Sequence, residues 1–162
     1  MIFIKNGRVI DPARGVDRVE DVLIEGGKIA AAGEEASARA AAAGKSGADA
    51  DDAQPGRPEL TVIDAAGLVV APGLMDVHVH FRDPGLTYKE DIHTGAEAAA
   101  KGGFTTVVCM ANTKPPVDNV ETLRYVIEEG KKTPIHVLSA ATITKGMKGQ
   151  ELVDMDALKA AG

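Results

Sequence analysis

Short apolar runs separated by turn residues fill the first 33 positions and resume at residue 60. The runs are Ile2–Ile4, Arg8–Ile10, Asp21–Glu25, Lys28–Ala31, Leu60–Asp64 and Gly67–Val70. Runs of this length bounded by turn residues are typical of short β-strands. Asn6-Gly7 and Gly26-Gly27 are hairpin-forming pairs and predict that their flanking strands are antiparallel neighbours. Residues 1–71 are therefore expected to form a small β domain of the sandwich type.

The segment 34–58 interrupts this pattern. It is rich in Ala, Asp and Gly and has no large apolar side chain. Such a composition buries too little apolar surface to offset the entropy lost on ordering. The alanine run 38–43 could form a short helix, but the sequence favours a mobile surface insertion within the β domain.

From Pro72 onward, strand-like and helix-like patterns alternate. The expected strands are Leu74–Phe81, Phe104–Met110 and Ile135–Ile143, and the expected helices are Thr87–Lys101, Asp118–Gly130 and Asp154–Ala161. A Ser/Thr/Asp residue three positions before Glu predicts a capping box at the start of the first two helices. The β-α-β-α-β-α order predicts a parallel sheet with right-handed crossovers over residues 72–162.

Two architectures fit this order: an open doubly wound sheet and the first three βα units of a (β/α)8 barrel. A barrel takes about 200 residues or more, and only about 90 follow Pro72, so a barrel would be incomplete. The sheet would then be open, and Val107, Val137 and Leu138 are expected to be exposed. The first strand is not followed by a glycine-rich phosphate-binding motif, which weakens the nucleotide-binding alternative.

Composition and charge narrow the classes of partner. The formal net charge is -6 and the pI about 5.2, which argues against a surface for nucleic acids or anionic membranes. The one cysteine, Cys109, cannot form an internal disulfide. No signal peptide and no apolar run of about 20 residues is seen. These features predict a cytoplasmic protein.

Two histidines stand one residue apart at the end of the first expected barrel strand. Side chains alternate along a strand, so His78 and His80 share a face and can converge on one ion. The carboxyl ends of parallel strands are where α/β folds place their chemistry, and imidazole suits zinc. The alternative is a pair of hydrogen-bonded core histidines, but the spacing favours a metal site.

Further polar residues follow at the same edge. Arg82 would lie on the face of His80 and suits an anionic substrate group, because guanidinium binds carboxylate in a bidentate manner. The alternative is an arginine paired with Asp83 or Glu90. Asn112 follows the second strand and can donate and accept hydrogen bonds, although asparagine also commonly opens loops.

Cys109 is interpreted as a core residue, and the remaining histidines, His93 and His136, as structural.

Three stretches together resemble a known family: APGLMDVHVHFRDPG, EAAAKGGFTTVVCMANTKPPVDN and TITKGMKGQELVDMDALKAAG. They are similar to bacterial dihydroorotases of the amidohydrolase superfamily, and the N-terminal β unit resembles that family's small β domain. His-x-His is typical of the superfamily, and the following arginine together with MANTKP narrows the resemblance to dihydroorotases. Many of these have proline where Ala111 stands, which leaves Asn112 in register.

The resemblance implies a (β/α)8 barrel with one or two zinc ions per complete subunit. His78 and His80 would be zinc ligands, and Arg82 and Asn112 would hold the substrate carboxylate. The implied reaction is the reversible cyclisation of N-carbamoyl-L-aspartate to L-dihydroorotate in pyrimidine biosynthesis. In the hydrolytic direction, water assisted by zinc attacks the ring amide carbonyl, and a carboxylate transfers the proton.

The resemblance also implies residues beyond Gly162. The remaining metal ligands and the catalytic aspartate are expected there, so the 162 residues alone are expected to lack catalytic activity. The expected partners are a small-molecule substrate, a second copy in a homodimer, and aspartate carbamoyltransferase. The alternatives are another cyclic-amide hydrolase (a hydantoinase, also called dihydropyrimidinase, or an allantoinase) and a non-catalytic dihydroorotase-like assembly partner. Arg82 argues against the first, and retention of both histidines argues against the second.

Overall fold

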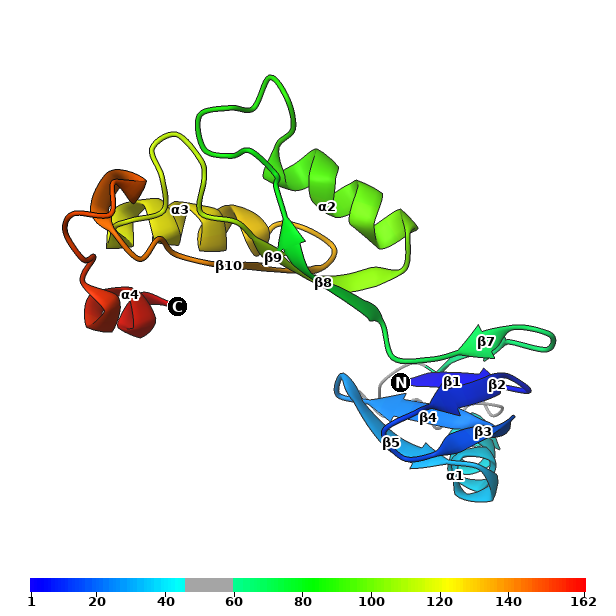
Figure 1. The fold of residues 1–162 in the computed structure, drawn as a ribbon. Coiled ribbons are helices and arrows are strands. Elements are labelled where there is room, and N and C mark those ends of the chain that lie inside the picture. The colour runs from blue at the N-terminus through cyan, green and yellow to red at the C-terminus, as the bar shows by residue number, and fades with distance from the viewer. Residues whose placement is uncertain (46–59) are drawn as a thin grey trace, which may run out of the picture. The chain divides into compact units, whose positions relative to one another are not determined.

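The computed structural model (Figure 1) describes residues 1–45 and 60–162. The chain divides into two compact units, Met1–Pro72 and Gly73–Gly162. The boundary expected from the sequence was at residues 71 and 72. Among the described residues, no helix combines the length and the apolar character needed to cross a bilayer.

The described residues of the first unit form two small sheets and one helix. Its strands are β1 (Ile2–Lys5), β2 (Arg8–Asp11), β3 (Val16–Val19), β4 (Val22–Glu25), β5 (Lys28–Ala32), β6 (Thr61–Asp64) and β7 (Val69–Val70). One sheet has the strand order β5-β4-β1-β6 and the other β3-β2-β7. The expected hairpin at Gly26-Gly27 is confirmed: β4 and β5 pair antiparallel, and both glycines have positive φ.

The expected hairpin at Asn6-Gly7 is wrong. β1 pairs with β4 and β6, whereas β2 pairs with β3 and β7, so the two strands belong to different sheets. Asn6 does turn the chain, with φ 64°, but its amide nitrogens bond to Asp21 and Asp64. Both edges of β1 are already paired, so the turn directs the chain into the second sheet. The strand β3 was not expected.

The segment 34–58 also differs from the expected mobile insertion. Its first part forms helix α1 (Glu34–Lys45), and the rest of the segment lies outside the described residues. Ala36 and Ala40 are buried against Leu23 and Ala31. Small side chains can therefore make the contacts of a packed helix, because they let its backbone approach the sheet closely.

The second unit is a three-stranded parallel sheet with helices between its strands. The elements are β8 (Leu74–Val79), α2 (Ile92–Lys101), β9 (Phe104–Cys109), α3 (Val120–Gly130), β10 (His136–Ser139), the 3₁₀ turn η1 (Lys145–Met147) and α4 (Met155–Ala161). The sheet order is β10-β9-β8, and both strand pairs are parallel. This confirms the expected parallel sheet.

Helices α2 and α3 cover one face of this sheet (Figure 1). Val107 and Val137 lie in register and are buried in the core with Ile92 of α2 and Val126 of α3. The expectation that both valines would be exposed is therefore wrong. Leu138, which points to the opposite face, is 51% exposed as expected. Helices on a single face are a feature of barrels, whereas doubly wound sheets have helices on both.

The helices begin later than the capping-box patterns suggested. α2 starts at Ile92, not near Thr87, because Asp91 accepts a hydrogen bond from the Thr94 amide. That bond keeps the pKa of Asp91 below its usual range. α3 is capped by Asn119 in place of Asp118. Asp, Asn and Thr all cap helices, so sequence alone cannot choose among neighbouring candidates.

We expect Ala36→Leu to destabilise the protein by about 1–3 kcal/mol, because the larger side chain overpacks the contact between α1 and its sheet. Ala38→Leu is the matched control, since Ala38 lies on the exposed side of the same helix. The measurement is chemical denaturation of the complete protein. Equal stability of the two variants would contradict a packed α1.

Candidate functional site

His78 and His80 lie at the carboxyl end of β8 and share one face of the sheet. Val79, between them, packs against the helix-covered core, so the two imidazoles point to the opposite face. Their ring centroids are 5.2 Å apart with an interplanar angle of 61°, and both residues are exposed. They are therefore not a pair of buried core histidines.

Asn112, after β9, contacts the second of these rings. Its Oδ1 lies 2.9 Å from His80 Nδ1. A carbonyl oxygen can only accept, so Nδ1 is the donor in this contact, and in the neutral tautomer that fits it the lone pair is on Nε2. The sequence predicted Asn112 at the same edge of the sheet as His80, but the hydrogen bond between them was not predicted. The Asn112 Nδ2 amide has no hydrogen bond to any described residue, so it remains a donor.

The two histidines and Asn112 line an open cleft of about 620 Å³. Its other walls come from the ends of β9 and β10 and the loop after β10: Met110, Ala111, Ala140, Ala141, Thr142, Ile143, Thr144, Met147 and Gly149. The lining residues that follow β10 were not expected in the site, although the rule that active sites form at the carboxyl ends of parallel strands could have found them. The result is a mostly apolar cleft with convergent imidazole and amide groups.

A second cleft, of about 660 Å³, lies along β10 and the end of α3. It is lined by Thr105, Ile127, Gly130, Lys131, Thr133, Pro134, Ile135, His136, Val137 and Leu138. The loop that precedes β10 contributes much of this lining, so the cleft reaches the amino end of the strand, away from His78 and His80. Its size alone does not make it a site, because no cluster of convergent titratable groups lines it.

Arg82 lies beyond the end of β8. The alternation of side chains along a strand, on which the prediction for Arg82 rested, therefore does not determine which way its side chain points. β8 ends at Val79, and Arg82 has φ 64°. Its guanidinium has no hydrogen bond or ion pair to any described residue, so the alternative of pairing with Asp83 or Glu90 is not observed. It is also absent from the described residues that line the cleft of His78 and His80.

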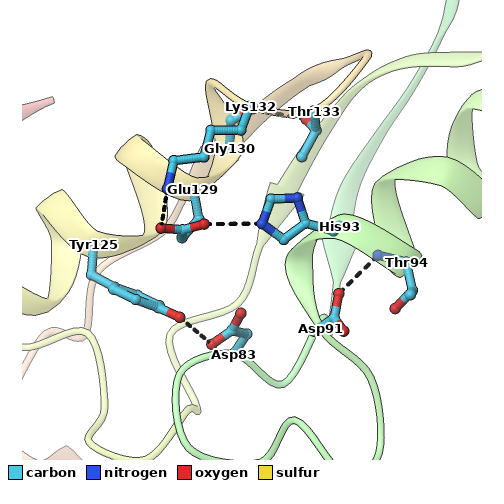
Figure 2. Close-up of polar contacts among 9 residues, drawn as sticks. All are labelled: Asp83, Asp91, His93, Thr94, Tyr125, Glu129, Gly130, Lys132 and Thr133. Carbon is cyan, nitrogen blue, oxygen red and sulfur yellow. Dashed lines mark hydrogen bonds and ion pairs between the residues drawn. The ribbon is translucent and has the colours of Figure 1, made fainter.

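Asp83 pairs with a residue that the sequence analysis did not consider. Its side chain is 6% exposed, and Oδ1 accepts a hydrogen bond of 3.0 Å from the Tyr125 hydroxyl on α3 (Figure 2). Burial, with a further contribution from this bond, raises the pKa of Tyr125 to about 12. No sequence pattern indicated the contact, because the two residues are 42 positions apart.

The remaining cysteine and histidine considered from the sequence make contacts that are typical of structural residues. Burial raises the pKa of the Cys109 thiol to about 11, which makes it an unreactive core residue. His93 Nε2 lies 2.9 Å from Glu129 Oε2, linking α2 to α3 (Figure 2).

Within residues 1–45 and 60–162, no group of three or more His, Cys, Asp or Glu side chains could hold a metal.

Comparison with known proteins identifies the family of this chain. The family model for dihydro-orotase-like proteins matches residues 67–162. The chain is 55% identical to a dihydroorotase of Clostridioides difficile and 52% identical to one of Clostridium acetobutylicum. Each match covers 100% of this chain and 34% of the relative. The chain thus spans about a third of the length of these curated relatives.

Solved structures agree on the fold. An L-hydantoinase (dihydropyrimidinase) from Arthrobacter aurescens matches with a TM-score of 0.59 and 26% identity, over 88% of this chain and 28% of that chain. Enamidase, a member of the amidohydrolase superfamily, matches with a TM-score of 0.65 and 24% identity, over 99% and 40%. These matches support the expected partial (β/α)8 barrel preceded by a small β domain. Because the family model covers more than half of the chain, and 55% of the aligned positions are identical in the dihydroorotase of Clostridioides difficile, this chain belongs to the dihydro-orotase-like family.

Proposed function

We propose that the complete protein is a zinc-dependent dihydroorotase. It would catalyse the reversible cyclisation of N-carbamoyl-L-aspartate to L-dihydroorotate in pyrimidine biosynthesis. The observation that carries the proposal is the pair of exposed imidazoles at the carboxyl end of β8, with Asn112 fixing the tautomer of one of them. The curated relatives named dihydroorotase support the substrate.

The geometry of His78 and His80 fits a shared metal ion. Two imidazoles that bind one tetrahedral zinc ion through nitrogens about 2.1 Å away place their ring centroids about 5 Å apart. The observed separation is 5.2 Å. The hydrogen bond from His80 Nδ1 to Asn112 leaves Nε2 as the basic nitrogen, in the way that second partners orient metal-binding histidines.

In this proposal the chain supplies part of the site. A bound zinc ion polarises a carbonyl group and lowers the pKa of water. Catalytic zinc usually has three protein ligands, so further ligands, and the aspartate that transfers the proton, would come from outside these 162 residues. The role of His78 and His80 is to hold the ion at the open face of the sheet.

Arg82 and Asn112 are proposed to bind the substrate carboxylate. The Arg82 guanidinium is without a partner among the described residues, so its five donors are available. The Asn112 Nδ2 amide is likewise available while its oxygen holds His80. Charge-assisted bidentate pairing would fix the orientation of the substrate relative to the metal.

The structural match to the L-hydantoinase supports one alternative function, the hydrolysis of hydantoin. Sequence identity favours the dihydroorotase function, since this chain is 26% identical to the L-hydantoinase and 55% identical to the dihydroorotase from Clostridioides difficile. Chemistry separates them as well, because a neutral hydantoin ring offers Arg82 no carboxylate. Dihydroorotate is therefore proposed over hydantoin.

The proposal extends to the setting of the enzyme. It includes the cytoplasm as the compartment, a homodimer as the assembly, and aspartate carbamoyltransferase as a protein partner. These three elements follow from the family resemblance and remain predictions.

We expect the variant His78→Ala/His80→Ala of the complete protein to lose most of its bound zinc, because two of the few ligands are removed. Elemental analysis of the purified protein is the measurement. His136→Ala is the control, since this exposed histidine begins β10 and does not line the cleft. Equal zinc in the double variant and the wild type would reject the metal assignment.

We expect Arg82→Ala to raise the KM for dihydroorotate by about 10- to 100-fold, since a hydrogen bond to a charged group contributes about 1.5–3 kcal/mol. Arg82→Lys keeps the charge but not the planar fork and should recover only part of the loss. Steady-state kinetics in both directions provide the test, with Arg124→Ala on the exposed side of α3 as control. Efficient hydrolysis of hydantoin by the wild type, with no effect of Arg82→Ala, would favour the alternative function.

A further inference from the structure

We propose that Tyr125 is a positioning residue that holds Arg82 in place through Asp83. The inference rests on the proposed role of Arg82 in binding the substrate carboxylate. It assigns a function to a contact between α3 and the loop after β8. Tyr125 would not touch the substrate and would act only through its neighbours.

The backbone of Arg82 needs external support. Its φ of 64° lies in the left-handed region, which costs a non-glycine residue on the order of 1–2 kcal/mol. Such a conformation persists only where the surrounding contacts hold it. The loop after β8 must therefore be fixed by neighbouring elements, or Arg82 would relax and its guanidinium would move.

Two backbone contacts provide part of this support. The Leu86 amide donates to the Arg82 carbonyl at 2.9 Å, and the Lys114 amide donates to the Pro84 carbonyl at 3.0 Å. Gly85 lies so close to the Lys114 carbonyl that an added Cβ would be 1.7 Å from its oxygen. The loop of Arg82 is thus packed directly on the loop of Asn112.

The third contact depends on a side chain. Asp83 is almost fully buried, and the Tyr125 hydroxyl is the one hydrogen-bond donor to its carboxylate among the described residues. Figure 2 shows the tyrosine reaching from α3 toward this carboxylate. A buried carboxylate without a donor is strongly disfavoured. Removing the hydroxyl should therefore displace Asp83, and with it the adjacent Arg82.

The same bond keeps Asp83 from competing with the substrate. Asp83 and Glu90 are the first two carboxylates that follow Arg82 in the sequence. Asp83 is engaged by Tyr125, and Glu90 accepts from the Asp91 amide and the Thr94 hydroxyl. A carboxylate released by loss of the tyrosine hydroxyl could pair with the guanidinium, and the arginine would then be less available to an anionic substrate.

A neighbouring ion pair provides a contrast. Glu129, one turn along α3 from Tyr125, contacts His93 and Lys132 (Figure 2). The contacts with Lys132 and His93 lower the pKa of Glu129. The contact with His93 links α3 to α2, and neither contact includes Asp83. Weakening this pair should loosen the helix packing without freeing Arg82.

The experiment measures KM and kcat of the complete enzyme with dihydroorotate. We expect Tyr125→Phe to raise KM about 5- to 20-fold and to leave kcat within about twofold, since the altered group only positions a binding residue. Tyr88→Phe removes a hydroxyl from a side chain that is 78% exposed and should change neither constant. Glu129→Gln should lower the melting temperature with KM unchanged.

Two further variants test the route through Asp83 and Arg82. Asp83→Asn keeps an oxygen that accepts from Tyr125 and should stay near wild type. Asp83→Ala loses the anchor but leaves no carboxylate to pair with Arg82, so it should raise KM by less than Tyr125→Phe. In an Arg82→Ala background, Tyr125→Phe should raise KM no further, because residues that act as a unit are non-additive.

The outcomes separate this inference from the proposed function. If Arg82→Ala raises KM but Tyr125→Phe behaves like Tyr88→Phe, the positioning role is overturned and the proposed function stands. An equal effect of Tyr125→Phe with and without Arg82 also overturns it. If Arg82→Ala leaves KM unchanged, the proposed substrate contact is overturned, and the positioning role with it.

Discussion

Parallel pairing of β8, β9 and β10 is the constraint on which the rest of the second unit depends. It brings the carboxyl ends of all three strands to one edge, so that His80 and Asn112 meet although 32 positions separate them. The same pairing aligns Val107 and Val137 on the opposite face. Their burial under α2 and α3 orients the sheet and leaves the histidines on its open face.

The loops at that edge have a different source of order. They lack ladder hydrogen bonds, so their shape comes from close approaches and individual side-chain contacts. Gly85 against Lys114 and Asp83 with Tyr125 are two such contacts. In the proposed site, they hold the left-handed backbone of Arg82. The site thus combines rigid strand ends with a loop whose geometry depends on a neighbouring helix.

Local patterns predicted local features and failed where partners were chosen at long range. Gly26-Gly27 joins adjacent strands because both residues adopt positive φ without steric cost. Asn6-Gly7 turns the chain equally well, but β1 is already paired on both edges, so no hairpin forms. The alanines of α1 carry too little apolar surface to predict packing, yet Ala36 and Ala40 are buried because the sheet offers them a close fit.

The sequence by itself determined the order of strands and helices in the second unit, the shared face of His78 and His80, and the family. These depend on the two-residue period of strands, on the alternation of element types, and on motifs contiguous in the chain. Only the tertiary structure decided that Asn112 orients His80, that Asp91 and Asn119 cap the helices, and that Tyr125 reaches Asp83. Each of these is a choice among chemically equivalent partners, and folding makes it by bringing one of them within hydrogen-bonding distance.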